Sequence, residues 1–324
     1  MKERICAVLL LVTMLLTVAS CASGSPAPPS PETSPVTDSD ITEPPDRPSV
    51  NISMDRDGNP IVLPETIEKV ISMGPSNTEI FAALGFAEKL IAVDEYSDNI
   101  PGVDPSIAIF DMMNPDAERI ISMMPDVIFS TAMSMSGGMD PYRIIADAGI
   151  CVIYIPSSTS IEAIKEDIRF FAAVMDAQEK GEELVAEMEE AIDGVMKIGE
   201  TISDKKTVYF ELSAAPHMYS FGKGSFLHEI IEIIGAVNIF GDFESWISVS
   251  DEIVIDADPD VILTSVNYIE NPVGEIVSRQ GWGDVTAVKN GDVYYISTDA
   301  SNRPSQNVVK AMLEMAKAIY PEIF

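Results

Sequence analysis

Short runs of apolar and β-branched residues alternate along the chain with stretches of helical periodicity. Residues 69–73 and 90–93 have the composition of buried strands. Between them, a capping box at 76–79 predicts the start of a helix over 76–84, and Gly85 stands where a C-terminal cap belongs. Alternation of this kind predicts α/β layers with mostly parallel sheets flanked by helices.

One spacing occurs twice. Glu118 precedes Pro125-Asp126 by seven residues, and Glu252 precedes Pro259-Asp260 by the same seven. In each copy a short helix should end at the Pro-Asp turn and lead into a buried strand. A second spacing also recurs, since Glu79 stands six residues before Gly85 and Glu229 six before Gly235. Two matched spacings in the same order predict two lobes of similar topology.

The longest helical stretch, about 160–202, lies between the two copies. Thr159 and Glu162 predict a capping box at its start, and Gly181 predicts a break or a junction of two helices. Residues 182–198 carry apolar side chains at helical spacing on one stripe, which is a packing face. We expect a stiff helix that bridges the lobes and permits only a modest closure when ligand binds.

The N-terminus predicts export. Lys2 and Arg4 precede an apolar run that is too short for a spanning helix, which needs about 20 residues, but suits a secretory signal. Small residues then lead into Cys21, as in a bacterial lipobox, so Cys21 is the expected lipidation site. The alternative is an ordinary signal peptide with an incidental cysteine.

A segment rich in proline and hydroxyl residues follows Cys21. Residues 22–49 hold 8 of the 22 prolines and little that could be buried, so we expect an extended spacer. The expected organisation is a signal peptide, a lipid-anchored linker, an N-terminal lobe, a helical segment and a C-terminal lobe: 1–20, 21–49, 50–159, 160–203 and 204–324. The protein should be extracytoplasmic, anchored to the membrane through lipid only, and monomeric.

Charge and cysteine content narrow the possibilities further. The net charge of −32 argues against nucleic-acid binding and against docking on anionic lipid. Cys151 is the one cysteine after Cys21, and its apolar neighbours indicate a buried core thiol.

Several segments together resemble the solute-binding proteins that serve ABC importers of cobalamin, ferric siderophores and haem. They include Met73-Gly74-Pro75-Ser76-Asn77-Thr78-Glu79, Asn114-Pro115-Asp116-Ala117-Glu118 and Val249-Ser250-Asp251-Glu252. The resemblance covers nearly all of 66–324. It implies two α/β lobes joined by one helix, with the ligand in the cleft between them. It also implies that Glu118 and Glu252 dock on the two copies of a permease, and carboxylate–arginine pairing on a two-fold partner makes that physically sensible. The alternative is that both are ordinary surface glutamates near a helix start.

The expected ligand contacts follow from strand ends and aromatic content. They are Met73, Pro75, Tyr96, Met112, Met113, His217, Tyr219, Trp246 and Arg303. Aromatic faces suit a macrocycle or a catechol, and an unpaired guanidinium at Arg303 would suit an anionic group. Structural roles for Trp246, Arg303 and His217 stay open. Arg303 and Lys223 together favour a ferric siderophore slightly over a corrinoid or haem.

Catalysis finds no support in the sequence. Only His217 and His228 are present, and Gly-x-Ser-x-Gly, HExxH, a P-loop and paired cysteines are missing. We therefore expect a binding protein with no cofactor and no protein-bound metal of its own. A ligand-sensing receptor or surface-binding lipoprotein without transport is the alternative function.

Overall fold

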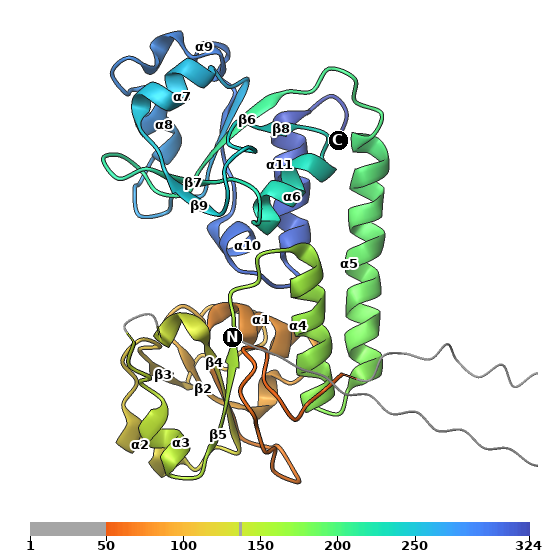
Figure 1. The fold of residues 1–324 in the computed structure, drawn as a ribbon, viewed down its shortest axis with the longest axis vertical. Helices are drawn as coiled ribbons and strands as arrows, with labels where there is room; N and C mark the ends of the chain where they lie inside the picture. Colours follow the sequence, from red (N-terminus) through yellow and green to blue (C-terminus); the bar gives the residue numbers. More distant parts are fainter. Residues whose placement is uncertain (1–49, 136–137) are drawn as a thin grey trace, which may run out of the picture. The chain divides into compact units, whose positions relative to one another are not determined.

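The computed structural model describes residues 50–135 and 138–324. The predicted signal peptide, linker and Cys21 lie outside these residues. The N-terminal lobe is built on a parallel five-stranded sheet in the order β3-β2-β1-β4-β5 (Figure 1). Its strands are β1 (Val70–Met73), β2 (Leu90–Asp94), β3 (Ala108–Phe110), β4 (Val127–Thr131) and β5 (Cys151–Ile155).

The C-terminal lobe repeats this plan. Its parallel sheet has the order β11-β10-β6-β8, formed by β6 (Thr207–Glu211), β8 (Val237–Asn238), β10 (Val261–Thr264) and β11 (Val293–Tyr295). Strand for strand, this order matches β5-β4-β1-β2. The C-terminal lobe adds an antiparallel pair, β7 (Tyr219–Phe221) and β9 (Trp246–Ser248). The prediction of two similar lobes with mostly parallel sheets is confirmed.

Helices flank both sheets. They are α1 (Pro75–Ala83), α2 (Ala117–Met123), α3 (Arg143–Asp147), α4 (Ile161–Val174), α5 (Gln178–Gly199), α6 (Phe226–Ile233), α7 (Asp251–Ala257), α8 (Pro272–Val277), α9 (Thr286–Asn290), α10 (Thr298–Asn302) and α11 (Val308–Ile319). Short 3-10 turns occur at η1 (Ala87–Lys89), η2 (Ala132–Met135) and η3 (Trp282–Asp284). Within the described ranges, no helix has the length and apolar character to cross a membrane.

The repeated Pro-Asp turns have a clear structural reason. In the first lobe the Asp126 carboxylate accepts the backbone N–H of Lys69, 2.8 Å away, just before β1. In the second lobe the Asp260 carboxylate accepts the N–H of Thr207, also at 2.8 Å, at the start of β6. Each aspartate thereby ties the end of one helix to the start of the central strand.

Two expected helix starts are wrong in detail. Glu79 does not complete a capping box on α1: the N-cap is Gly74, and no side chain caps the helix. The start of α4 is capped by Ser160, whose hydroxyl accepts from Ala163 N, and not by Thr159. In α1 the expected hydroxyl, Ser76, lies inside the helix, and in α4 the capping hydroxyl is one residue later than expected.

The expected helix break at Gly181 is also misplaced. The chain turns at 175–177, where Asp176 has a φ of 53°, and Gly181 lies inside α5. A Cβ built at Gly181 would lie 2.5 Å from the Cβ of Ala172 on α4. This glycine therefore serves the close approach of two helices.

The core of the N-terminal lobe centres on three aromatic rings. Phe81 of α1, Phe129 of β4 and Phe171 of α4 are each fully buried, with ring centroids 4.6 to 5.2 Å apart. They join a helix of the lobe to its sheet and to the helical segment. Cys151 is only partly buried at the edge of this core, and burial raises the pKa of its thiol.

Helix α5 runs alongside both lobes (Figure 1). It packs on α4 at the N-terminal lobe and on α6 and α11 at the C-terminal lobe. Its last residue, Gly199, lies against the end of α6, where an added Cβ would lie 2.3 Å from the carbonyl oxygen of Ile233. The bridging helix is thus fixed by close packing at both ends.

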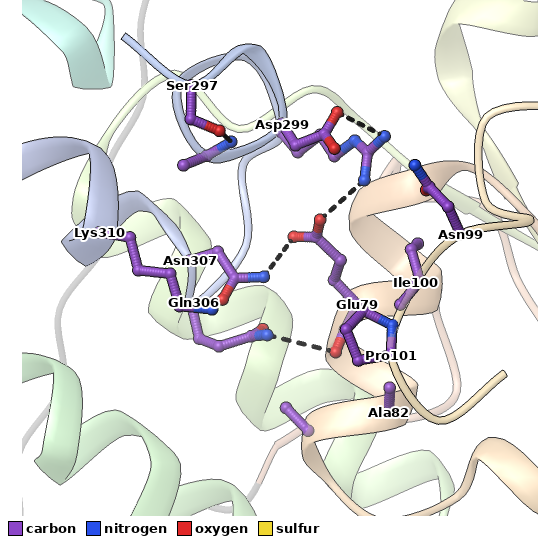
Figure 2. Close-up of a pocket in the computed structure, with 13 residues that line it drawn as sticks. Glu79, Ala82, Asn99, Ile100, Pro101, Ser297, Asp299, Gln306, Asn307 and Lys310 are labelled. Atoms are coloured by element: carbon purple, nitrogen blue, oxygen red, sulfur yellow. Dashed lines mark hydrogen bonds and ion pairs between the residues drawn. The ribbon is translucent and has the colours of Figure 1, made fainter. Parts of the chain in front are cut away.

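A second junction joins the lobes through Glu79, which is only 6% exposed. Its carboxylate accepts from Arg303 Nη1 at 3.0 Å, from Asn307 Nδ2 at 2.8 Å and from the Ser305 hydroxyl. Figure 2 shows Glu79 on α1 directed at Asn307. One buried carboxylate of the first lobe therefore gathers three donors from the second.

The glycine packing of α5 can be tested within one helix. We expect Gly199→Ala to destabilise the protein by about 2 kcal/mol, because the methyl group would overlap backbone atoms of α6. Gly194→Ala is the matched control: nothing lies within 4 Å of its built Cβ. There the gain in helix propensity should stabilise by about 0.5–1 kcal/mol. Urea unfolding of both variants measures the difference, and equal effects would contradict this account.

The interlobe carboxylate gives a second prediction. Glu79→Gln keeps the side-chain shape but removes the charge that Arg303 faces, so we expect a loss of about 2 kcal/mol in the free energy of unfolding. Glu88→Gln, an exposed position in the same lobe, should change stability by less than about 0.5 kcal/mol. Unfolding curves that were identical for the two variants would refute a structural role for the Glu79 charge.

Candidate ligand-binding site

Two cavities lie at the junction of the lobes and share Arg303. The larger, about 370 Å³, lies against the later part of α1 and against α10 and α11 (Figure 2). Most of its polar groups already bond to one another through Glu79. Gln306 donates to the backbone carbonyl of Glu79, while its Oε1 has no partner in the described part of the chain.

The smaller cavity, about 210 Å³, lies where ligands usually bind in α/β sheets. It is lined by the segments that directly follow four parallel strands: 74–77 after β1, Tyr96 after β2, Thr131 and Met133 at the end of β4, and 155–157 at the end of β5. The chain order reverses between β1 and β4, and crevices at such switch points are the common binding sites of open parallel sheets. The C-terminal lobe contributes 302–304.

The floor of this cavity is the start of α1. Asn77 is 2% exposed, and its Nδ2 has no hydrogen-bond partner among the described residues. Gly74 makes room for it, since a Cβ there would lie 3.2 Å from Nδ2. A buried donor without a partner is unusual in a folded protein.

Tyr96 and Met112 form the apolar side of the cavity, and two carboxylates position them, the buried Asp94 and the partly buried Glu95. Asp94 accepts from the Tyr96 N–H at 2.9 Å, and burial raises the pKa of Asp94. Glu95 accepts from the Met112 N–H at 3.0 Å. Tyr142 donates its hydroxyl to the Met112 carbonyl at 2.9 Å. Tyr96 is 59% exposed, but the backbone of its loop is fixed by these hydrogen bonds.

Arg303 is not the unpaired guanidinium that the sequence predicted. It lies 3.0 Å from Glu79 and 2.7 Å from Asp299, and it donates to the Tyr96 carbonyl at 3.1 Å. Lys223, the other expected cation, is 52% exposed and lines a different surface depression together with Asp242. The charge argument for an anionic ligand therefore fails.

The structure separates the expected contact residues into three groups. Pro75, Tyr96, Met112 and Arg303 line the cavity. Met73 has no exposed surface and lies in the core of the N-terminal lobe, because β1 is covered on both faces.

Met113, His217, Tyr219 and Trp246 are exposed outside the cavity. Figure 1 shows β7 and β9, which carry Tyr219 and Trp246, on the side of the C-terminal lobe that faces the N-terminal lobe. The Trp246 ring packs edge-on against Phe221, with 6.3 Å between centroids, and is 53% exposed. Tyr219 and Trp246 are therefore exposed aromatic residues on strands that lie on this side of the lobe.

Three parts of the cavity lining were not expected from the sequence: Asn77, which the pattern placed in a capping box, Thr131, and the 155–157 segment. Their position after strand ends was the available signal. Within the described residues, no group of three His, Cys, Asp or Glu side chains is arranged to hold a metal ion.

Glu118 and Glu252 occupy equivalent places. Each is the second residue of its helix, α2 or α7, and each is exposed. Figure 1 shows both helices on the side of the lobes away from α5. A bond from the Ser250 hydroxyl lowers the pKa of Glu252, which favours its charged form.

Known proteins share this fold and sequence pattern. The chain is 30% identical over 272 residues to an uncharacterized ABC transporter substrate-binding lipoprotein, YvrC, of Bacillus subtilis, covering 83% of this chain and 85% of that protein. It is 26% identical over 254 residues to the vitamin B12-binding protein of Vibrio parahaemolyticus, covering 78% and 90%.

Solved structures of other proteins have a similar fold. A possible iron-binding, periplasmic solute-binding protein from Staphylococcus epidermidis superposes with a TM-score of 0.71 at 27% identity, over 79% of this chain and all of that one. The apo haem-binding protein RhuT of Roseiflexus has the same fold, with a TM-score of 0.70 at 22% identity over 79% and 99% of the two chains. The sequence profile of the periplasmic binding protein family matches residues 70–300. This chain belongs to that family.

Proposed function

We propose that this protein captures a bulky metal chelate between its lobes and delivers it to the permease of an ABC importer. The observation that supports this most directly is the cavity at the strand ends of the first lobe, with the exposed aromatic surface of β7 and β9 on the facing side of the second. A cavity of about 210 Å³ holds only part of such a ligand, because sites for drug-sized ligands span about 300–1,000 Å³. The remainder would lie against Tyr219 and Trp246.

The transport role rests on family membership and on the relatives. One is named as a substrate-binding lipoprotein of an ABC transporter, and others as binding vitamin B12, haem or iron. We extend this to a chelate ligand and to attachment outside the cytoplasmic membrane through Cys21. The family supplies solute-binding components of transport, and we propose no catalytic step and no cofactor for this chain.

Tryptophan fluorescence tests the ligand position. Trp246 is half-exposed, whereas Trp282 is fully buried with its Nε1 donating to Asp251 at 2.7 Å. We expect saturable quenching by one chelate from a panel of cobalamin, cobinamide, haem and ferric siderophores. Trp246→Phe should remove most of the quenching but keep binding measurable by calorimetry.

Two results would count against this assignment. Quenching that survived in Trp246→Phe would place the ligand away from the aromatic surface. If no compound of the panel binds in either fluorescence or calorimetry, the proposal that the ligand is a metal chelate is wrong.

Charge reversal tests delivery separately from capture. The double variant Glu118→Lys/Glu252→Lys should lose at least about tenfold in uptake rate with unchanged ligand affinity, because two charge-assisted contacts with the permease become repulsive. Glu183→Lys/Glu190→Lys, two exposed positions on α5, is the matched control with the same change in net charge. Uptake in cells that depend on the importer measures both. If the double variant imports normally, the docking role of the two glutamates is wrong.

A further inference from the structure

The first turn of α1 presents free donors to the cavity. Helix geometry leaves the first N–H groups of any helix without an internal acceptor. In α1 no side chain supplies one: Gly74 at the N-cap bears none, and Pro75 has no N–H of its own. The N–H groups of Ser76 and Asn77 remain, at the partially positive end of the helix dipole.

Asn77 adds a second, independent donor at the same place. Its Nδ2 is buried and has no partner in the described residues, and Asn77 is one of the residues that line the cavity. A buried amide N–H is normally bonded, because desolvating it without a partner destabilises the fold. A ligand oxygen in the cavity would satisfy it together with the helix start.

The matching helix of the other lobe shows that this arrangement is particular to the first lobe. Helix α6 follows β6 and β7 as α1 follows β1, but Ser225 caps it by accepting the N–H of Leu227 at 3.2 Å. The same fold therefore carries a self-capped helix in one copy and an uncapped one in the copy that forms the cavity.

The charge balance limits what the donors can hold. Among the described residues that line the cavity, Arg303 alone is charged. Its guanidinium is paired with two carboxylates, Glu79 and Asp299. The cavity thus offers neutral donors but no side chain with an unpaired positive charge, and a strongly anionic ligand would have to compete with the interlobe contact for Arg303.

We propose that the start of α1 and the Asn77 amide bind a neutral carbonyl oxygen of the ligand, and that the chelate carries no net negative charge. This inference rests on the proposed function and narrows its substrate class. Two kinds of chelate present such oxygens: corrinoids with carboxamide side arms, and cationic ferric hydroxamates.

Matched probes test the charge. Dicyanocobyrinic acid and its heptaamide share one corrin and one metal but carry carboxylates or carboxamides. Ferrioxamine B and a ferric tricatecholate make a second pair, a cation against a trianion. We expect the neutral or cationic member of at least one pair to bind at least about 100-fold more tightly, measured by calorimetry at constant ionic strength. Preference for the carboxylate or catecholate member would overturn the proposal, and the pair that binds identifies the kind of chelate.

Substitutions at Asn77 test the contact itself. Asn77→Ala should weaken binding of the preferred chelate about tenfold through loss of one hydrogen bond. Asn77→Asp has the same shape but replaces the donor with an acceptor, and it should weaken binding at least as much. Asn290→Ala, an exposed position at the end of α9, is the control and should bind normally. Unchanged affinity in Asn77→Asp would show that the side chain only fills space.

The ligand-free protein gives a readout that needs no ligand. Removing an unpartnered buried amide should leave the melting temperature of Asn77→Ala equal to that of the parent protein or raise it by about 2–4 °C. A lower melting temperature would show that the amide already has a partner in the free protein, and would overturn the assignment. Absence of any chelate binding to the parent protein would instead refute the proposed function, so the two failures are distinguishable.

Discussion

The buried carboxylate of Glu79 is the interaction on which the relation between the lobes depends. It lies on a helix of the first lobe and accepts from Arg303, Ser305 and Asn307 of the second. A buried charge of this kind is stable only if its partners are complete. The segment 303–307 therefore has a fixed place against α1. That place also determines where Arg303 lies, and with it one wall of both interlobe cavities.

Local patterns in the sequence predicted much of this fold. Strand positions and the C-terminal glycines depend on neighbours within a few residues. The doubled Pro-Asp turn was visible as a repeat, although each aspartate bonds to a strand start more than 50 residues away. The errors arose where a side chain had two possible partners. Glu79 suited a capping box by spacing, but donors more than 220 residues away in the chain bind it instead. Gly181 resembled a helix break because its close contact with Ala172 is invisible in the sequence.

The candidate site was less predictable than the fold, because it also depends on which partners each side chain finds in the tertiary structure. Tyr96, Met112 and Pro75 follow strands, and position alone placed them at the cavity. Met73 is one residue too early, since the last residue of a strand covered on both faces is still core. The charge of Arg303 was evident, but its compensation by Glu79 and Asp299 requires the tertiary structure. The pairing of Arg303 with Glu79 and Asp299 removes the unpaired positive charge on which the expectation of an anionic ligand group rested.

The glycine contact between α5 and the end of α6 has a consequence for how empty and loaded protein would compete for an importer. We expect a bridge packed at both ends, together with the Glu79 junction, to leave the two lobes little freedom to change their separation. The empty and loaded forms would then present Glu118 and Glu252 at nearly the same spacing. An importer that recognises only the distance between these two glutamates would bind the empty and loaded forms equally well. Empty protein would then compete with loaded protein for the importer. The rate of import would depend on the ratio of the two forms at the cell surface as well as on affinity for the chelate.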